Sequence, residues 1–204
     1  MYLYSTTLSK DGAINQIVSG CFASADTEQL VVAKGKLIEF YEFDDSSDSL
    51  RVICTQEMFG LVRSLLSFRL LGMQTDFLVV GSDSGRIVVL EFNQQTQKFC
   101  KVVQETYGKS GCRRVVAGEY LAADPKGRAL MIAAVEREKL VYLINRDSQN
   151  KLITSSPLEA SKGQTLTIDL CGVDNGLENP QFAAIEIDYS EVGLTPKDKK
   201  FREK

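Results

Sequence analysis

The chain has 204 residues, an apolar fraction of 44% and a formal net charge of −3. This length allows one or two domains, and the apolar fraction is sufficient for a sizeable core. The acidic balance argues against general binding to a nucleic-acid backbone, which requires clustered lysine and arginine, but it leaves room for a local basic patch. No apolar run reaches the ~18 residues of a membrane helix and the N-terminus lacks a signal-peptide pattern, so we expect a protein that is neither membrane-bound nor secreted.

The first half of the chain contains two similar units of four predicted strands. In the first unit, strands are predicted at Asn15–Phe22, in a hairpin over Gln29–Phe43 and at Leu50–Glu57. In the second unit, they are predicted at Val62–Leu70, in a hairpin over Phe77–Phe92 and at Phe99–Glu105. Gly35 and Asp83-Ser84-Gly85 provide the residues that tight hairpin turns require.

The second half of the chain repeats this design and then stops part-way. A third unit has predicted strands at Arg113–Pro125, in a hairpin over Ala129–Asn145 and at Lys151–Glu159. Within it, the charged run from Glu136 falls where the other units have a turn. A fourth unit offers only two strands, beginning at Gln164 and at Phe182.

Equivalent apolar positions recur at intervals of 48, 52 and 53 residues, at Leu30, Leu78, Leu130 and Ala183. A period near fifty residues with several strands per unit is typical of β-propeller blades. We therefore predict an all-β, WD-repeat-like propeller of the seven-bladed type, of which about three and a half blades are present. Its expected blades cover roughly 14–58, 62–106, 113–160 and, incompletely, 164–189.

This organisation makes residues 1–189 a partial N-terminal propeller, and the charged stretch 190–204 a polar flexible tail or insertion. A blade that stops after its second strand exposes an unpaired sheet edge, which native proteins avoid. We therefore expect the chain to be a piece of a larger protein.

Residue types that carry catalysis or bind metals are sparse. The chain has five cysteines, none in a Cys-x-x-Cys pair, and no histidine, so we expect no metal site, no cofactor and reduced thiols. Gly108-Lys109-Ser110 is similar to the end of a phosphate-binding loop, but the glycine required five positions earlier is Val103. Cys112 lies among basic residues that favour a thiolate, yet no histidine can serve as its base. We expect a protein that is not an enzyme.

Lys109, Arg113 and Arg114 form the most distinctive polar group. Because strands alternate in direction within a blade, the central hairpin turns and the connections between blades emerge on one face. Asp83–Arg86 and Tyr107–Arg114 are therefore predicted to share a surface. Loops on a rigid scaffold commonly bind partners. A charge-balanced surface loop and a direct RNA contact are the alternative interpretations.

Several long strings give the chain a resemblance to a known family. They include FLVVGSDSGRIVVLEF, ETYGKSGCRRVVAGEYLAADPKGRALMIAAVE, SSPLEA and GVDNGLENPQFAAIE. From residue 1 to about 189 the sequence resembles the N-terminal propeller region of the splicing factor 3b subunit 3 family, also called spliceosome-associated protein 130. The large subunit of the damage-specific DNA-binding protein and the large cleavage–polyadenylation specificity subunit belong to the same superfamily.

The resemblance implies a non-enzymatic, nuclear scaffold that holds protein partners for branch-site recognition in pre-mRNA splicing. The implied partners are the HEAT-repeat subunit 1, a PHD-finger-like small subunit and subunit 5 of splicing factor 3b, with RNA contacted at most indirectly. The alternative function is a nucleic-acid-associated propeller of the DNA-damage or 3′-end-processing type. The resemblance implies partner contacts at Glu105, Tyr107, Lys109, Ser110, Cys112, Arg113, Arg114, Glu119, Asn145, Arg146, Asp147, Ser156, Pro157, Glu159 and Lys162.

Overall fold

The computed structural model describes residues 12–107, 114–149, 151–174, 176 and 178–190. Every regular element in these ranges is a β-strand, which confirms the predicted all-β class. In the same ranges, no helix is long and apolar enough to cross a membrane. The predicted tail, 190–204, lies outside the described residues apart from its first residue.

The first two sheets each contain four antiparallel strands in chain order. The first sheet consists of β1 (Ile14–Gly20), β2 (Gln29–Lys34), β3 (Leu37–Asp44) and β4 (Ser49–Glu57). The second consists of β5 (Val62–Phe68), β6 (Phe77–Ser82), β7 (Arg86–Asn93) and β8 (Lys98–Thr106). Gly35 and Gly85 close the central hairpins with φ of 57° and 74°, a region that favours glycine. The predicted hairpins of both units are confirmed.

The third and fourth sheets are less regular. The third consists of β9 (Tyr120–Ala123), β10 (Ala129–Ala133), β12 (Lys139–Arg146), β13 (Leu152–Thr154) and β14 (Leu158–Glu159). The fourth consists of β11 (Glu136–Arg137), β15 (Lys162–Val173) and β16 (Gln181–Asp188). The two strands expected in the fourth unit are therefore present.

Three details of the third unit differ from the sequence prediction. The strand expected over Arg113–Pro125 is shorter, because β9 covers only Tyr120–Ala123 and 114–119 form the turns and bends of a connector. The prediction of a single strand over Lys151–Glu159 is wrong, because β13 and β14 are separate strands that pair with different parts of β12. Pro157 lies between them, and proline has no N–H to donate to a ladder. The run from Glu136 is not a simple turn either, since β11 lies between β10 and β12 of the third sheet in the chain but pairs with β15 of the fourth sheet.

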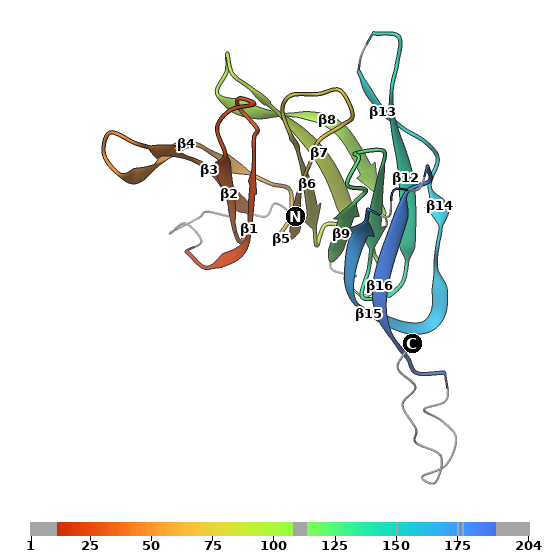
Figure 1. Ribbon diagram of the computed structural model, residues 1–204. Helices are drawn as coiled ribbons and strands as arrows, with labels where there is room; N and C mark the ends of the chain where they lie inside the picture. Colours follow the sequence, from red (N-terminus) through yellow and green to blue (C-terminus); the bar gives the residue numbers. More distant parts are fainter. Residues whose placement is uncertain (1–11, 108–113, 150, 175, 177, 191–204) are drawn as a thin grey trace, which may run out of the picture.

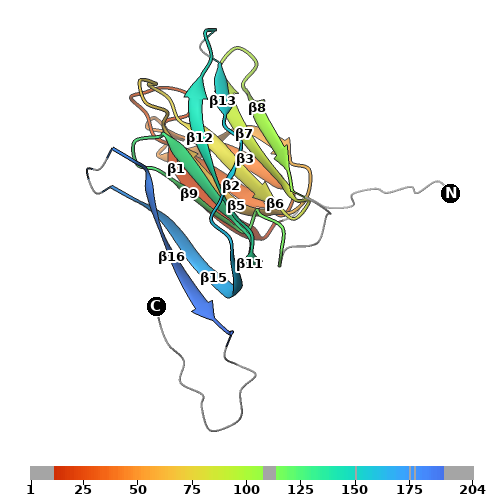
Figure 2. The same ribbon diagram turned by 90° about the vertical axis from the view of Figure 1, so that its right-hand side faces the viewer.

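The sheets fan out around their first strands, as a propeller requires (Figures 1 and 2). β1 contacts β5, β5 contacts β9 and β9 contacts β15, so the first strands of the first three sheets and the first long strand of the fourth lie together. The described sheets follow one another without closing into a ring. This arrangement confirms the propeller prediction for a set of partial blades.

The core consists of layers between neighbouring sheets, and β6 shows how the sequence produces them. Val79 packs into the cluster between the second and third sheets, whereas Leu78 and Val80 pack into the cluster between the first and second. Successive side chains on a strand point to opposite faces, so a strand between two layers must be apolar at every position. All of β6 is accordingly buried.

Backbone contacts also join the sheets where a side chain would not fit. A Cβ at Gly127, in the turn before β10, would lie 1.8 Å from the carbonyl oxygen of Arg69, in the loop after β5. The Gly127 turn is held by Asp124, whose Oδ2 accepts bonds from the backbone N–H and Nε of Arg128 at 3.2 and 2.8 Å. The Asp124 carboxylate is almost fully buried.

Replacing Asp124 by asparagine is expected to change how stability depends on pH. Hydrogen bonds from Arg128 hold the pKa of Asp124 below its usual value of 3.8. The stabilisation that the ionised Asp124 gives to the fold is therefore fully present above about pH 4 and is lost as pH falls through the lowered pKa. Asp124→Asn should cost about 1–2 kcal/mol at pH 7 and should flatten the loss of stability in acid.

Urea unfolding measured from pH 7 down to pH 2.5 tests this expectation. Asp26→Asn is the matched control, because Asp26 is an exposed carboxylate in the loop before β2. An Asp124→Asn protein with the acid slope of the unchanged protein would contradict the assignment.

Candidate protein-binding face

One face of the molecule is formed by the central hairpin turns and by the connectors that lead from one sheet to the next. We call it the connector face and define it by the turns 35–36 and 83–85, by the segment 134–138 that contains β11, and by the connectors 58–61, 107 and 114–119. Backbone bonds join these segments. Val62 N–H donates to Gly35 O at 2.9 Å, Tyr107 N–H to Gly85 O at 2.7 Å, and Glu136 N–H to Arg114 O at 2.7 Å.

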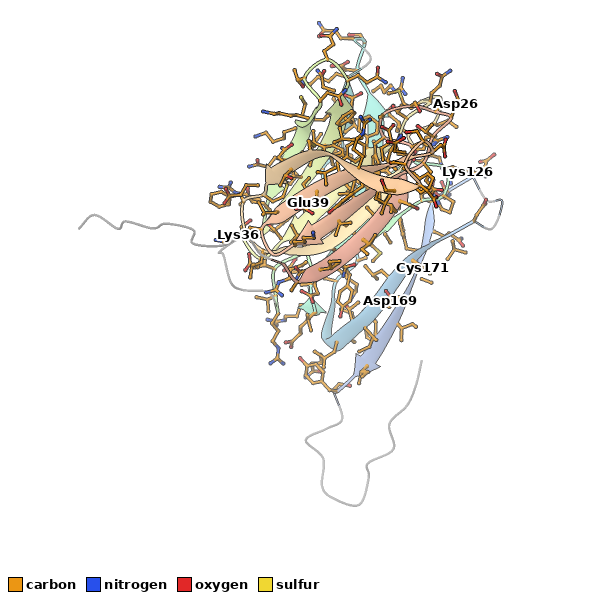
Figure 3. All side chains as sticks on the ribbon, turned by 90° about the vertical axis from the view of Figure 1, so that its left-hand side faces the viewer. Asp26, Lys36, Glu39, Lys126, Asp169 and Cys171 are labelled. Carbon is orange, nitrogen blue, oxygen red and sulfur yellow. The ribbon has the colours of Figure 1, made fainter. Side chains whose placement is uncertain are left out.

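These bonds confirm that the Asp83–Arg86 turn and Tyr107 share a surface. The opposite face has the loops between first and second strands and the turns between third and fourth strands. Figure 3 shows Lys36 at one end of the sheets, and Asp26 and Lys126 at the other. The connector face is thus a surface of loops joined by backbone hydrogen bonds. It lies at the end of the sheets opposite the loops that contain Asp26 and Lys126.

The described residues of the first predicted contact stretch lie on this face. Glu105 is exposed near the end of β8, and Glu119 is half-buried just before β9, where its N–H donates to Ala133 O at 3.2 Å. The Tyr107 hydroxyl donates to the hydroxyl of Tyr142, and burial raises the pKa of both phenols. The predicted contacts Lys109, Ser110, Cys112 and Arg113 lie outside the described residues.

Arg114, in the same stretch, joins the third sheet to the fourth. Its Nε donates to Glu136 Oε2, while the Tyr189 hydroxyl donates to Glu136 Oε1. These two bonds lower the pKa of Glu136, with the tyrosine bond the larger cause. The Arg114 side chain nevertheless remains 69% exposed, so part of its guanidinium faces solvent.

Two further ion pairs cross or border the same junction. Lys139, which is nearly fully buried at the start of β12, pairs with Glu186 on β16. Lys162 pairs with Asp188 at 3.1 Å, and bonds from the Ser190 hydroxyl and N–H hold the pKa of Asp188 well below its usual value. Lys162 therefore also has an intramolecular role that the sequence did not indicate.

The second predicted stretch runs from one end of the third sheet to the other. Asn145 and Arg146 end β12, and Asp147 accepts the N–H bonds of Gln149 and Lys151 at 2.9 and 2.8 Å in the next turn. That turn lies on the face opposite the connector face. The remaining predicted contacts run along the outer edge of the third sheet and return toward the connector face; they are Ser156, Pro157, Glu159 and Lys162.

Sequence reasoning missed Phe59 as a surface residue. Phe59 lies in the connector between β4 and β5, its side chain is 68% exposed, and the Arg86 guanidinium carbon lies 3.9 Å from its ring centroid. The sequence did contain a signal, because Phe59 is an aromatic residue next to Gly60 in the short connector between two units. In the described part of the chain, no group of three or more His, Cys, Asp or Glu side chains could hold a metal ion.

Comparison with known proteins decides the family. Residues 13–203 match the family described as "RSE1/DDB1/CPSF1 first beta-propeller". The chain belongs to this family. Membership explains why the sheets fan around their first strands, and it confirms the resemblance read from the long sequence strings.

Individual members of the family are similar over almost the whole chain. Spliceosome-associated protein 130 A of Arabidopsis thaliana is 53% identical over 196 residues, covering 96% of this chain and 16% of the relative. Splicing factor 3B subunit 3 of Drosophila melanogaster is 50% identical over 196 residues, with the same coverage. Pre-mRNA-splicing factor RSE1 of Mycosarcoma maydis is 46% identical over 203 residues, covering 100% of this chain and 17% of the relative. The chain thus spans about one sixth of these relatives.

Proposed function

We propose that this chain is part of a nuclear, non-enzymatic scaffold that holds protein partners in the pre-mRNA splicing machinery. One observation carries the proposal: relatives named as splicing factors are 46–53% identical over nearly the whole chain. The sheets and their bonded connectors supply the mechanism. Because the loops are already ordered, little conformational entropy is lost when a partner binds.

The proposed partners are splicing factor 3b subunit 1, the PHD-finger-like small subunit and splicing factor 3b subunit 5. The chemistry of the connector face supports contact with protein, since Phe59 and Arg114 offer the aromatic and arginine groups that are enriched at protein interfaces. The formal net charge of −3 disfavours a phosphate backbone as the main ligand.

Depletion of the gene product tests the function. If the proposal holds, unspliced introns accumulate in total RNA, and an intact copy of the gene restores splicing. The tagged full-length product should also co-purify the three proposed subunits. Normal splicing after depletion would overturn the proposal, and salt-sensitive DNA binding with no splicing partners would favour the DNA-damage type of function instead.

Reversing the charge of Arg114 is expected to weaken partner assembly. Arg114→Glu in the full-length product, alone and with Arg113→Glu, should reduce recovery of the proposed subunits several-fold in 300 mM salt. Arg51→Glu is the matched control, because Arg51 is 67% exposed and also pairs with a glutamate, Glu42, at 2.9 Å.

The double variant Arg114→Glu/Glu136→Arg separates the two roles of this residue. It restores an intramolecular ion pair but keeps the altered charge at position 114. Recovery of full assembly in the double variant would mean that Arg114 only joins the sheets, and assembly unaffected by either variant would remove it from the interface.

A further inference from the structure

Phe59 and Arg86 form a compact unit at the connector face, and the proposed contact set includes neither of them. Phe59 is the most exposed aromatic side chain in the described part of the chain, at 68%. The guanidinium of Arg86 lies 3.9 Å above its ring centroid, within cation–π range. An aromatic ring and an arginine held at one exposed point are residue types enriched at the energetic centres of protein interfaces.

The backbone holds this ring in place. Ser82 Oγ donates to Phe59 O at 3.1 Å, and Leu61 N–H donates to Asp83 Oδ1 at 2.7 Å. Gly60 between them has φ of 105°, and a Cβ there would lie 2.7 Å from Asp83 Oδ1, so the connector is pressed against the hairpin turn. The ring is therefore presented by a fixed loop and would lose little entropy on binding.

Arg86 is half-buried and has no acidic partner within the described ranges. It forms no ion pair with another residue in the described ranges. Its cross-strand neighbour is Thr106, whereas Glu105 lies opposite Ile87, which packs toward the third sheet. Glu105 is thus directed to the other side of the sheet, because directly paired residues share a face.

We propose that Phe59 and Arg86 form an anchor site for an acidic segment of a partner protein. Arg86, stacked on the ring, presents its N–H groups edge-on to a carboxylate, and the exposed face of Phe59 packs against an adjoining apolar side chain. A carboxylate from a short segment suits this single arginine, whereas the acidic chain as a whole disfavours a continuous phosphate backbone. This inference rests on the proposed function of holding protein partners.

Photo-crosslinking in the full-length gene product tests the anchor site directly. Phe59 is replaced by p-benzoylphenylalanine, the protein is irradiated in its native assembly, and the crosslinked peptide is sequenced by mass spectrometry. We expect one segment of another polypeptide with aspartate or glutamate within a few residues of the crosslink. A crosslink to RNA, to a segment without acidic residues or to nothing would overturn the proposal.

Variants of Arg86 supply the second measurement. Arg86→Gln should reduce the crosslink yield at least about fivefold, and Arg86→Lys should restore it only in part, because lysine lacks the planar fork of donors. Arg51→Gln removes the same charge elsewhere and should leave the yield unchanged. Equal yields in all three variants would overturn the role of Arg86. Co-purification of the splicing subunits is scored separately, so loss of the crosslink with intact co-purification refutes this site and leaves the proposed function standing.

Discussion

Replacing Phe40 by alanine is expected to lower the free energy of unfolding by about 3–5 kcal/mol, the range for truncating a buried aromatic residue. Phe40 on β3 is fully buried and stands between the first and second sheets. Its ring centroid lies 4.7 Å from that of Phe92 and 5.1 Å from that of Phe99, both on the second sheet. The substitution removes these contacts and leaves a cavity in the layer that joins the two sheets.

Denaturant unfolding followed by circular dichroism measures this effect. Phe59→Ala is the matched control, because it removes the same side chain from an exposed position and should cost no more than about 1 kcal/mol, the size of a surface cation–π contact. Equal losses for the two variants would contradict the packing described for Phe40. A small loss for Phe59→Ala also supports the view that the exposed ring serves binding rather than folding.

Replacing Gly127 by alanine is expected to lower the free energy of unfolding by about 2–4 kcal/mol, for two separate reasons. Gly127 has φ of 69°, which an alanine adopts only with strain. The added Cβ would also lie 1.8 Å from Arg69 O and 2.8 Å from Arg69 C, which belong to the backbone of the neighbouring sheet's loop. A side chain could rotate away from the new methyl group, but this backbone can yield only if the second and third sheets separate.

Gly72→Ala isolates the first cause. Gly72 has φ of 82°, and a Cβ there would meet nothing within 4 Å, so this variant carries the backbone strain without the collision. It should cost about 1–2 kcal/mol. The difference between the melting temperatures of Gly127→Ala and Gly72→Ala then measures the destabilisation caused by the collision between the two sheets. No difference would mean that the loops move apart freely, and that the close approach does not stabilise the fold.

Much of the candidate site was predictable because it follows from strand direction. Alternation of strands places Asp83–Arg86 and Tyr107 on one face, and the bond from Tyr107 N–H to Gly85 O confirms it. The second predicted stretch covers a turn between third and fourth strands and the next connector, which the same rule places at opposite ends of the sheet. Its residues begin at the end of β12 and continue along the outer edge of the third sheet, so they lie at both ends of that sheet although they are close in sequence.

The structure also changes the interpretation of particular charges. Arg114 and Lys162 were predicted as surface contacts, yet both form ion pairs within the chain, with Glu136 and Asp188. Lys139 had no predicted role, yet its nearly buried ammonium pairs with Glu186 across the third and fourth sheets. Such pairings join residues far apart in sequence, so no local pattern could have indicated them.

The sequence alone determined most of the strands, their order and the repeat near fifty residues. Those properties depend on local alternation of apolar side chains and on turn residues such as Gly35 and Gly85, which act within a few positions of themselves. Only the tertiary structure decided that β11 pairs with the next sheet, that Gly127 touches the backbone of Arg69 and that Arg86 stacks on Phe59. These contacts depend on how one sheet packs on another, and that packing is set by the summed shape of many side chains rather than by any one segment.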